Sequence, residues 1–94
     1  MIIYRAMCKE ELEKTVGSGR PDFKKRFKWF SHNLEWVKSR VMGGEFNNSK
    51  FAKGRYDYLC KFEWDGKKAD FMSANEIQFD RRKNPTIIFL GIVR

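Results

Sequence analysis

The strongest constraint on the fold is an alternating pattern over residues 56–64. One set of positions is aromatic or apolar, with Tyr56, Tyr58, Cys60, Phe62 and Trp64, and it alternates with Asp57, Leu59, Lys61 and Glu63. Successive side chains of a strand point to opposite faces, so the pattern predicts a central strand with one buried aromatic face. The Asp65-Gly66 pair that follows is a strong hairpin signal, and we expect it to pair this strand with residues 68–72.

The rest of the chain predicts two helices followed mainly by strands. Further strands are expected over 2–4, 27–30, 76–79 and 86–90, and helices over 9–16 and 34–42. An apolar stripe of Cys8, Leu12 and Val16 marks the first helix, and Gly17, Gly19 and Pro21 end it.

Short polar residues mark the limits of the second helix. Ser31 or Asn33 can cap its start and Gly43-Gly44 its end, before a loop that reaches residue 55. The apolar run 86–90 is typical of a central strand. Helices early and antiparallel strands late predict an α+β fold, a small antiparallel or mixed β-sheet with two helices.

Length and composition predict one folded domain over residues 1–94. Hydrophobic residues make up 41% and aromatics 16%, enough apolar surface to exclude a disordered tail. Cys8 and Cys60 lie in apolar patterns with no CxxC, so we expect reduced core thiols, and with a single His we expect no metal site. No apolar run approaches a membrane span and no signal peptide is seen, so we expect a cytoplasmic monomer or small oligomer without membrane contact.

The charge is strongly and unevenly basic. The net charge is +8, with a pI of about 9.7. Two clusters hold the candidate contacts to an acidic partner, and they comprise Arg20, Lys24, Lys25, Arg26 and Lys28, then Arg81, Arg82 and Lys83. Clustered charge favours an acidic macromolecule, either a nucleic acid or an acidic protein surface, although plain solubility is the alternative. Interleaved Phe23, Phe27 and Trp29 suit phosphate tracking with base stacking.

Three polar spots lie at the ends of predicted strands. Tyr4-Arg5 follows the first apolar pair, and an Arg there can clamp a phosphate, or can simply pair with a helix glutamate such as Glu10. Ser31-His32-Asn33 precedes a helix, where free N–H groups bind anions, or where the side chains only cap.

The third spot is Asn75-Glu76, at the start of a later strand. A carboxylate at such a position can stabilise the positive charge that develops in sugar-transfer chemistry. The alternative is a solvated glutamate at the edge of a sheet.

Taken in order, these spots resemble the ADP-ribosyltransferase superfamily. In that family a first strand ends in an Arg or His that holds NAD, a second carries Ser-Thr-Ser near the nicotinamide, and a late strand begins with the catalytic Glu. The matching stretches here are residues 3–6, 28–31 and 75–79, and residues 86–90 would be the closing strand. The resemblance implies an ADP-ribosyltransferase-like fold and transfer of ADP-ribose from NAD to a macromolecule.

The resemblance also implies roles for individual residues. Glu76, Ser31 and His32 would be catalytic, and Arg5, Tyr4 and Asn33 would bind NAD. Two departures stand out. The middle motif is Ser31-His32-Asn33 instead of Ser-Thr-Ser, and Ala74 replaces the second acidic residue of arginine-modifying members, which argues against arginine as the target.

The alternative is a non-enzymatic binder of the kind that phages and other mobile elements encode, directed at host machinery, a defence complex or nucleic acid. An enzyme requires a cleft in which Arg5, Ser31 and Glu76 converge. A binder requires only a continuous basic face.

Overall fold

The alternating segment lies at the centre of a three-stranded antiparallel sheet. A computed structural model describes residues 1–42 and 56–93 of the chain. The first sheet has the order β1-β3-β6, with β1 (Ile2–Met7), β3 (Tyr58–Trp64) and β6 (Ile87–Ile92). The second has the order β2-β5-β4, with β2 (Phe27–Phe30), β4 (Ala69–Met72) and β5 (Ile77–Asp80). The helices are α1 (Lys9–Ser18), α2 (Leu34–Trp36) continuing as the π-helical η1 (Val37–Met42), and the 3-10 turn η2 (Arg81–Lys83).

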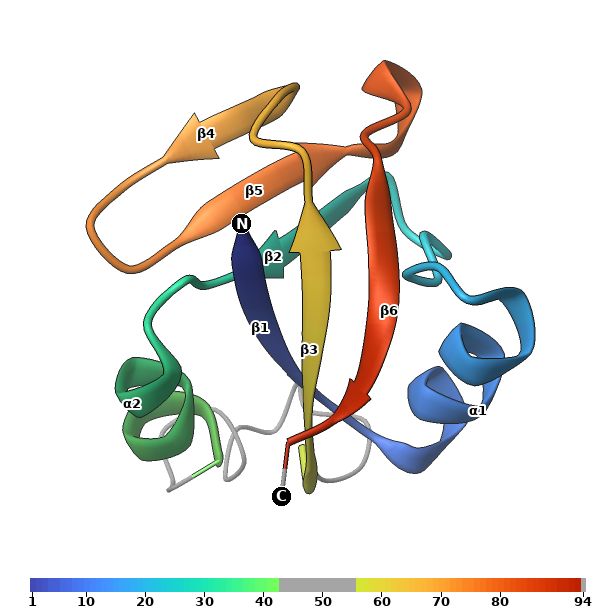
Figure 1. The fold of residues 1–94 in the computed structure, drawn as a ribbon, viewed down its shortest axis with the longest axis vertical. Coiled ribbons are helices and arrows are strands. Elements are labelled where there is room, and N and C mark those ends of the chain that lie inside the picture. Colours follow the sequence, from blue (N-terminus) through green and yellow to red (C-terminus); the bar gives the residue numbers. More distant parts are fainter. Residues whose placement is uncertain (43–55, 94) are drawn as a thin grey trace.

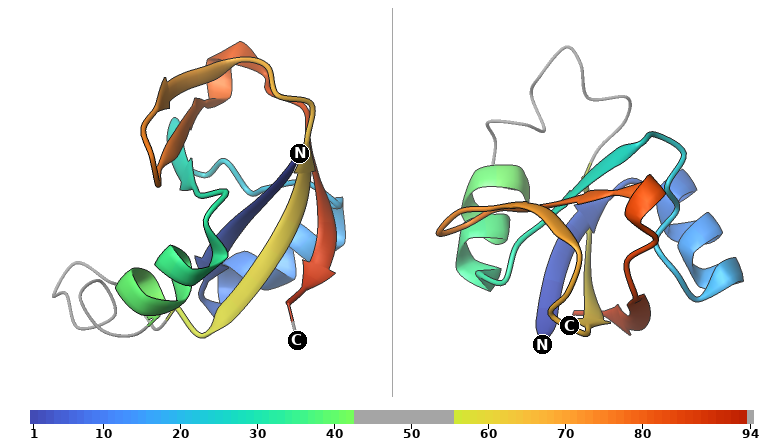
Figure 2. Two further views of the ribbon diagram at one scale, coloured as in Figure 1. Left: turned by 60° about the vertical axis from the view of Figure 1, so that its left-hand side comes forward. Right: turned by 90° about the horizontal axis from the view of Figure 1, so that it is seen from above.

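The two sheets approach each other where β1 passes β2 (Figures 1 and 2). There Tyr4 of β1 and Ser31, just after β2, exchange N–H···O bonds of 2.6 and 2.9 Å. Through this junction the strands run β4-β5-β2-β1-β3-β6. The α+β class expected from the sequence is confirmed, with antiparallel strands throughout both sheets.

The core lies between the sheets, and β3 supplies its largest side chains. Cys60, Phe62 and Trp64 are fully buried, as the alternation predicts. The Phe62 ring meets Phe30 of β2 edge-on at 5.2 Å, and Trp64 meets Phe79 of β5 at 5.2 Å. These aromatic contacts hold the second sheet against the first.

The expected hairpin between β3 and β4 does not form. β4 pairs with β5 instead, and the Asp65-Gly66 turn carries the chain from one sheet to the other. The turn is real and local: Asp65 accepts a 2.9 Å bond from the Lys67 N–H, and the Trp64 indole donates to the Lys67 carbonyl at 2.8 Å. The turn residues determine where the backbone reverses, but they do not determine which strand the following segment pairs with.

The expectation of a central strand at residues 86–90 is also wrong. β6 is an edge strand of the first sheet and leaves Ile88, Leu90 and Ile92 exposed. Only one of its faces packs inward, through Ile87 and Phe89. An apolar run indicates the capacity for burial on both faces, but it carries no information about its neighbours in the sheet.

Both helices form close to their expected limits. Gly19 ends α1 in the left-handed region, with φ of 72°, and its N–H donates to the Thr15 carbonyl. Val16 is 58% exposed, so the expected stripe is wrong there; Thr15, three residues after Leu12, takes the buried position. Asn33 caps α2 by accepting from the Trp36 N–H at 3.1 Å. The expected end at Gly43-Gly44 and the loop to residue 55 lie outside the described residues.

Both cysteines are free thiols. Cys60 is fully buried and Cys8 is partly exposed at the start of α1. Burial, together with the nearby charge of Glu11, raises the pKa of the Cys60 thiol to about 11, so it is inert at neutral pH. None of the helices in the described residues is long and apolar enough to cross a membrane.

Candidate functional site

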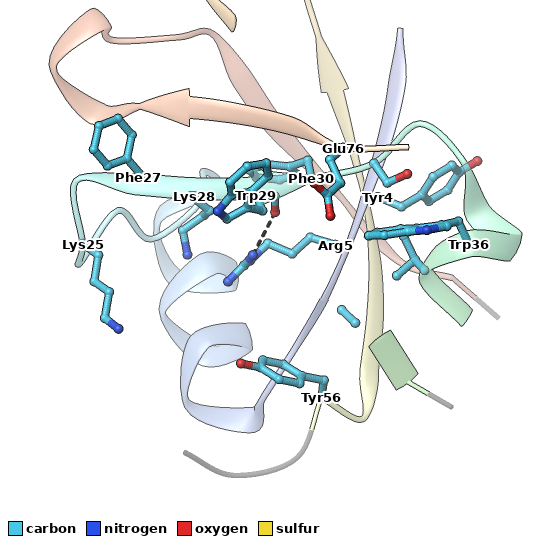
Figure 3. Close-up of a pocket in the computed structure, with 13 residues that line it drawn as sticks. Tyr4, Arg5, Lys25, Phe27, Lys28, Trp29, Phe30, Trp36, Tyr56 and Glu76 are labelled. Atoms are coloured by element: carbon cyan, nitrogen blue, oxygen red, sulfur yellow. Dashed lines mark hydrogen bonds between the residues drawn. The ribbon is translucent and has the colours of Figure 1, made fainter. Parts of the chain in front are cut away.

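A pocket of about 480 Å³ opens where the two sheets meet. It brings together Arg5 of β1, Ser31 at the end of β2, and Glu76 just before β5. Trp29, Trp36 and Tyr56 add aromatic walls. Figure 3 shows Glu76 above Arg5 with its carboxylate directed into the pocket, and Tyr56 on the opposite side. Three residues far apart in the sequence therefore converge, as the enzyme hypothesis requires.

Local backbone contacts fix two of these residues. Ser31 is buried and is held by the junction with Tyr4, and its hydroxyl accepts a 2.9 Å bond from the Asn33 N–H. Before β5, the Ser73 hydroxyl accepts from the Glu76 N–H at 3.1 Å, and the Ser73 N–H donates to the Glu76 carbonyl at 2.8 Å. This turn places the Glu76 side chain in the lining of the pocket.

Arg5 is held in one orientation by three hydrogen bonds. Its Nε and Nη2 donate to the Glu11 carboxylate at 2.6 and 2.9 Å, and its Nη1 donates to the Trp29 carbonyl at 2.8 Å. The alternative that Arg5 pairs with a glutamate of the first helix is therefore confirmed, with Glu11 as the partner in place of Glu10, which pairs with Lys14 along the helix. Guanidinium has five N–H groups, so two are left for a ligand within the described part of the chain.

Lys28 is a second cation beneath the pocket. It was expected on the basic surface, but it is only 7% exposed because it shares the inner face of β2 with Phe30. Its Nζ lies 3.3 Å from Glu11, which also binds Arg5, so two cations share one carboxylate. Burial and the charge of Arg5 lower the pKa of Lys28 to about 8, although Glu11 opposes the shift.

Glu11 is the anion that makes this pair of cations possible. Burial alone would raise its pKa, but hydrogen bonds and charge from Arg5 and Lys28 outweigh burial and lower it. The group as a whole carries a net positive charge next to the pocket. Such an arrangement favours a ligand that supplies further negative charge, as a phosphate does.

The stability of Lys28→Met relative to the wild-type protein should fall as pH rises from about 8 to 10.5. Unfolded Lys28 keeps its proton up to its ordinary pKa of 10.5, whereas the folded protein loses it near 8. Between pH 8 and pH 10.5 the unfolded state binds more protons at this residue than the folded state does, so the free energy of unfolding rises with pH. The stability cost of burying charged Lys28 is therefore largest below pH 8. Across this pH window the contribution of Lys28 to the free energy of unfolding changes by about 3 kcal/mol.

The measurement is urea unfolding of both proteins at several pH values across that window. Other titrating groups cancel in the difference between the two proteins, and Lys61→Met on the exposed face of β3 is the matched control. A stability difference that stays constant from pH 7 to 10.5 would contradict a buried, charged Lys28.

The Glu76 carboxylate is available for chemistry. It forms neither a hydrogen bond nor an ion pair with the residues that the structure describes, although it lines the pocket. Arg5 and Glu76 therefore place a cationic group and an unpaired carboxylate in the lining of one cavity. This arrangement can bind an anion at one end of a ligand and stabilise positive charge at the other.

Two expected site residues lie elsewhere. His32 is exposed and is not among the residues lining the pocket. Asn33 is committed to capping α2, and its amide donates to Asn75 Oδ1 at 3.0 Å. Asn33 therefore holds the segment before Glu76 in place, and neither His32 nor Asn33 is among the residues lining this pocket. Tyr4 does line it.

The basic residues fall into two groups. Arg20, Lys24, Lys25 and Arg82 are exposed. Others are tied to the chain, because Arg26 binds the buried Asp80 carboxylate at 2.9 Å, Lys83 binds Asp70 at 2.7 Å, and Arg81 donates to the Phe23 carbonyl. Hydrogen bonding from Arg26 lowers the pKa of Asp80.

Sequence reasoning missed Glu11 and the inward position of Lys28. A signal for Lys28 was present, because in a strand it must point to the same side as Phe30, two residues later. No local signal could have identified Glu11, which reaches Arg5 only after α1 folds back against β1.

Comparison with protein-family models, with curated proteins and with solved structures gave no match. Within the described ranges, no cluster of three or more His, Cys, Asp or Glu side chains is arranged to hold a metal ion.

Proposed function

We propose that this protein is an NAD-dependent ADP-ribosyltransferase. The observation that carries the proposal is the convergence of Arg5, Ser31 and Glu76 in one pocket. These are the positions that match the cofactor-holding, middle and catalytic motifs of the family that the sequence resembles. Arg5 lies on β1 and Ser31 just after β2, at the junction of the two sheets, and Glu76 precedes β5, which pairs with β2.

The pocket suits NAD in size and chemistry. A volume of about 480 Å³ lies within the range of small-molecule sites, which is roughly 300–1,000 Å³. Arg5 and Lys28 would face the diphosphate, with the two free N–H groups of Arg5 as its donors. Trp29, Trp36 and Tyr56 offer flat apolar faces for an aromatic ring.

Different residues of the chain would bind NAD and stabilise the transition state. Arg5 would bind and orient the diphosphate, and Glu76 would stabilise the positive charge that develops on the ribose. In the reaction, the bond between ribose C1′ and the nicotinamide nitrogen breaks, and nicotinamide leaves with the electron pair. A nucleophilic atom of the acceptor forms the new bond to C1′, and its proton passes to solvent. Ser31, whose hydroxyl is held by Asn33, would help fix the ribose end.

Arg5→Lys should weaken NAD binding about tenfold or more, because lysine keeps the charge but loses the planar fork. Calorimetric titration with NAD measures the affinity, and Arg20→Lys, an exposed arginine outside the pocket, is the matched control. Release of free nicotinamide is followed in parallel. If the wild-type protein releases no nicotinamide at millimolar NAD, the proposed function is wrong.

A further inference from the structure

The outer face of the second sheet carries an exposed aromatic row next to the pocket. Phe27 and Trp29 of β2 are 39% and 42% exposed, and Phe71 of β4 is 48% exposed. Trp29 and Phe71 flank Gln78 of β5, which is paired with both in the strand register. Their ring centroids are 6.1 Å apart at 70°. We call Phe27, Trp29 and Phe71 the aromatic row.

The row is not explained by packing within the chain. The inner face of β2 already supplies Phe30 and Lys28 to the interior, so Phe27 and Trp29 contribute little to the core. Large aromatic side chains that gather on a surface mark a contact site more often than isolated ones do. The row is also continuous with the pocket, because two of its members, Phe27 and Trp29, are among the residues that line the pocket.

Positive charge borders the row, and the aspartates of β4 and β5 beside it are paired with cations. The Arg26 guanidinium lies 4.8 Å from the centroid of the Phe27 ring, and exposed Lys25 lines the pocket. Asp80, at the end of β5, is paired with Arg26. Asp70 of β4 is likewise paired with Lys83. An incoming anion therefore meets cations beside exposed rings.

We infer that this face binds single-stranded nucleic acid and that the nucleic acid is the acceptor of ADP-ribose, a step that rests on the proposed function. Bases would stack on Trp29 and Phe71 while phosphates contact Lys24 and Lys25. Exposed aromatic rings with cations beside them suit a ligand in which flat bases alternate with phosphates. The exposed aliphatic side chains of β6, by contrast, present no aromatic surface for stacking.

The position of the row explains how a bound strand would reach the chemistry. A base stacked on Trp29 lies at the rim of the pocket that holds Glu76. The C1′–nicotinamide bond of NAD breaks, and nicotinamide takes the electron pair. A nitrogen or oxygen nucleophile of the nucleic acid then forms the new bond to C1′ and releases its proton to solvent.

The test begins with binding in the absence of NAD. A fluorescein-labelled mixed-sequence single strand of about 16 nucleotides is titrated by anisotropy. We expect Phe71→Ala to weaken binding about tenfold and Trp29→Phe to keep most of it, because stacking needs a flat ring. Ile88→Ala removes an equally exposed apolar side chain from the first sheet and should have no effect.

The charge contribution is tested separately through its dependence on salt. Lys24→Ala combined with Lys25→Ala should reduce the slope of log affinity against log salt by about 1.4, since roughly 0.7 counterions are released per phosphate contact on a single strand. Arg26 is left unchanged because it is held by Asp80. An unaltered slope, or equally tight binding of a duplex or of polyglutamate, would overturn the nucleic-acid assignment.

The acceptor role is tested with NAD labelled in the adenosine moiety. Label on the oligonucleotide, lost in Phe71→Ala at limiting strand concentration, supports the inference. Release of nicotinamide with label only on protein overturns the acceptor assignment and leaves the proposed function standing, whereas label only in free ADP-ribose indicates hydrolysis and overturns both. Absence of nicotinamide release, with or without the strand, overturns the proposed function and the acceptor role together, whatever the binding result.

Discussion

Glu76→Gln is expected to lower turnover of NAD by about 100-fold or more, roughly 3 kcal/mol, with little change in NAD affinity. The amide keeps the shape of the side chain but removes its charge. In the described structure the Glu76 carboxylate has no partner to lose, so the substitution leaves the fold intact. The charge matters only when positive charge develops on the ribose, and an interaction made in the transition state alone changes kcat more than binding.

Single-turnover release of nicotinamide, measured beside calorimetric titration with NAD, separates the two effects. Glu13→Gln, on the exposed side of α1, removes an equal charge away from the pocket and should leave both unchanged. If Glu76→Gln retained turnover within a few-fold of wild type, its carboxylate would have no role in the chemistry. Weaker NAD binding with unchanged turnover of the bound complex would assign it to binding instead.

Phe62→Ala should cost about 3–5 kcal/mol of unfolding free energy. Phe62 is fully buried in the middle of the central strand β3. Its ring contacts Phe30 across the sheets and Phe89 on β6, with centroids 5.2 and 5.5 Å apart. Truncation leaves a cavity at the point where both sheets meet, and few neighbours can move to fill it.

Denaturant titration measures the loss, and Phe71→Ala on the exposed face of β4 is the matched control, with an expected cost under about 1 kcal/mol. Because a domain of this size is stable by only about 5–15 kcal/mol, Phe62→Leu provides a milder variant that keeps the fold measurable. A cost below about 1 kcal/mol for Phe62→Ala would contradict its central position.

Local patterns in the sequence predicted the helices and strands. Contacts between distant segments determined how the strands pair and where each lies in its sheet. The Asn33 cap, the Gly19 stop and the alternation in β3 act over a few residues. The first two are confirmed, and the alternation is confirmed except at Leu59, which is buried in a second cluster with Ala6 and Val37. The partner of β4 and the place of β6 depend on contacts between segments far apart in the chain. No turn or run encodes those contacts, so both expectations failed.

The site shows the same division between local and distant information. Arg5 and Glu76 could be singled out as polar residues at strand ends, and the fold brings them into one pocket. His32 and Asn33 follow Ser31 directly, yet one is exposed and the other caps a helix. Being next to a site residue in sequence does not place a side chain in the pocket once the strand has ended and the backbone turns.

The junction between Tyr4 and Ser31 has a consequence for any chemistry in this pocket. Among the described residues, these two amides supply the backbone hydrogen bonds between β1 and the segment after β2, and the Arg5 bond to the Trp29 carbonyl links the sheets beside them. Arg5 belongs to one sheet and Glu76 precedes a strand of the other, so the distance between them follows the angle at which the sheets meet. A ligand held by both residues would therefore fix this angle, and a core substitution that alters the angle would misalign Arg5 and Glu76 without touching either.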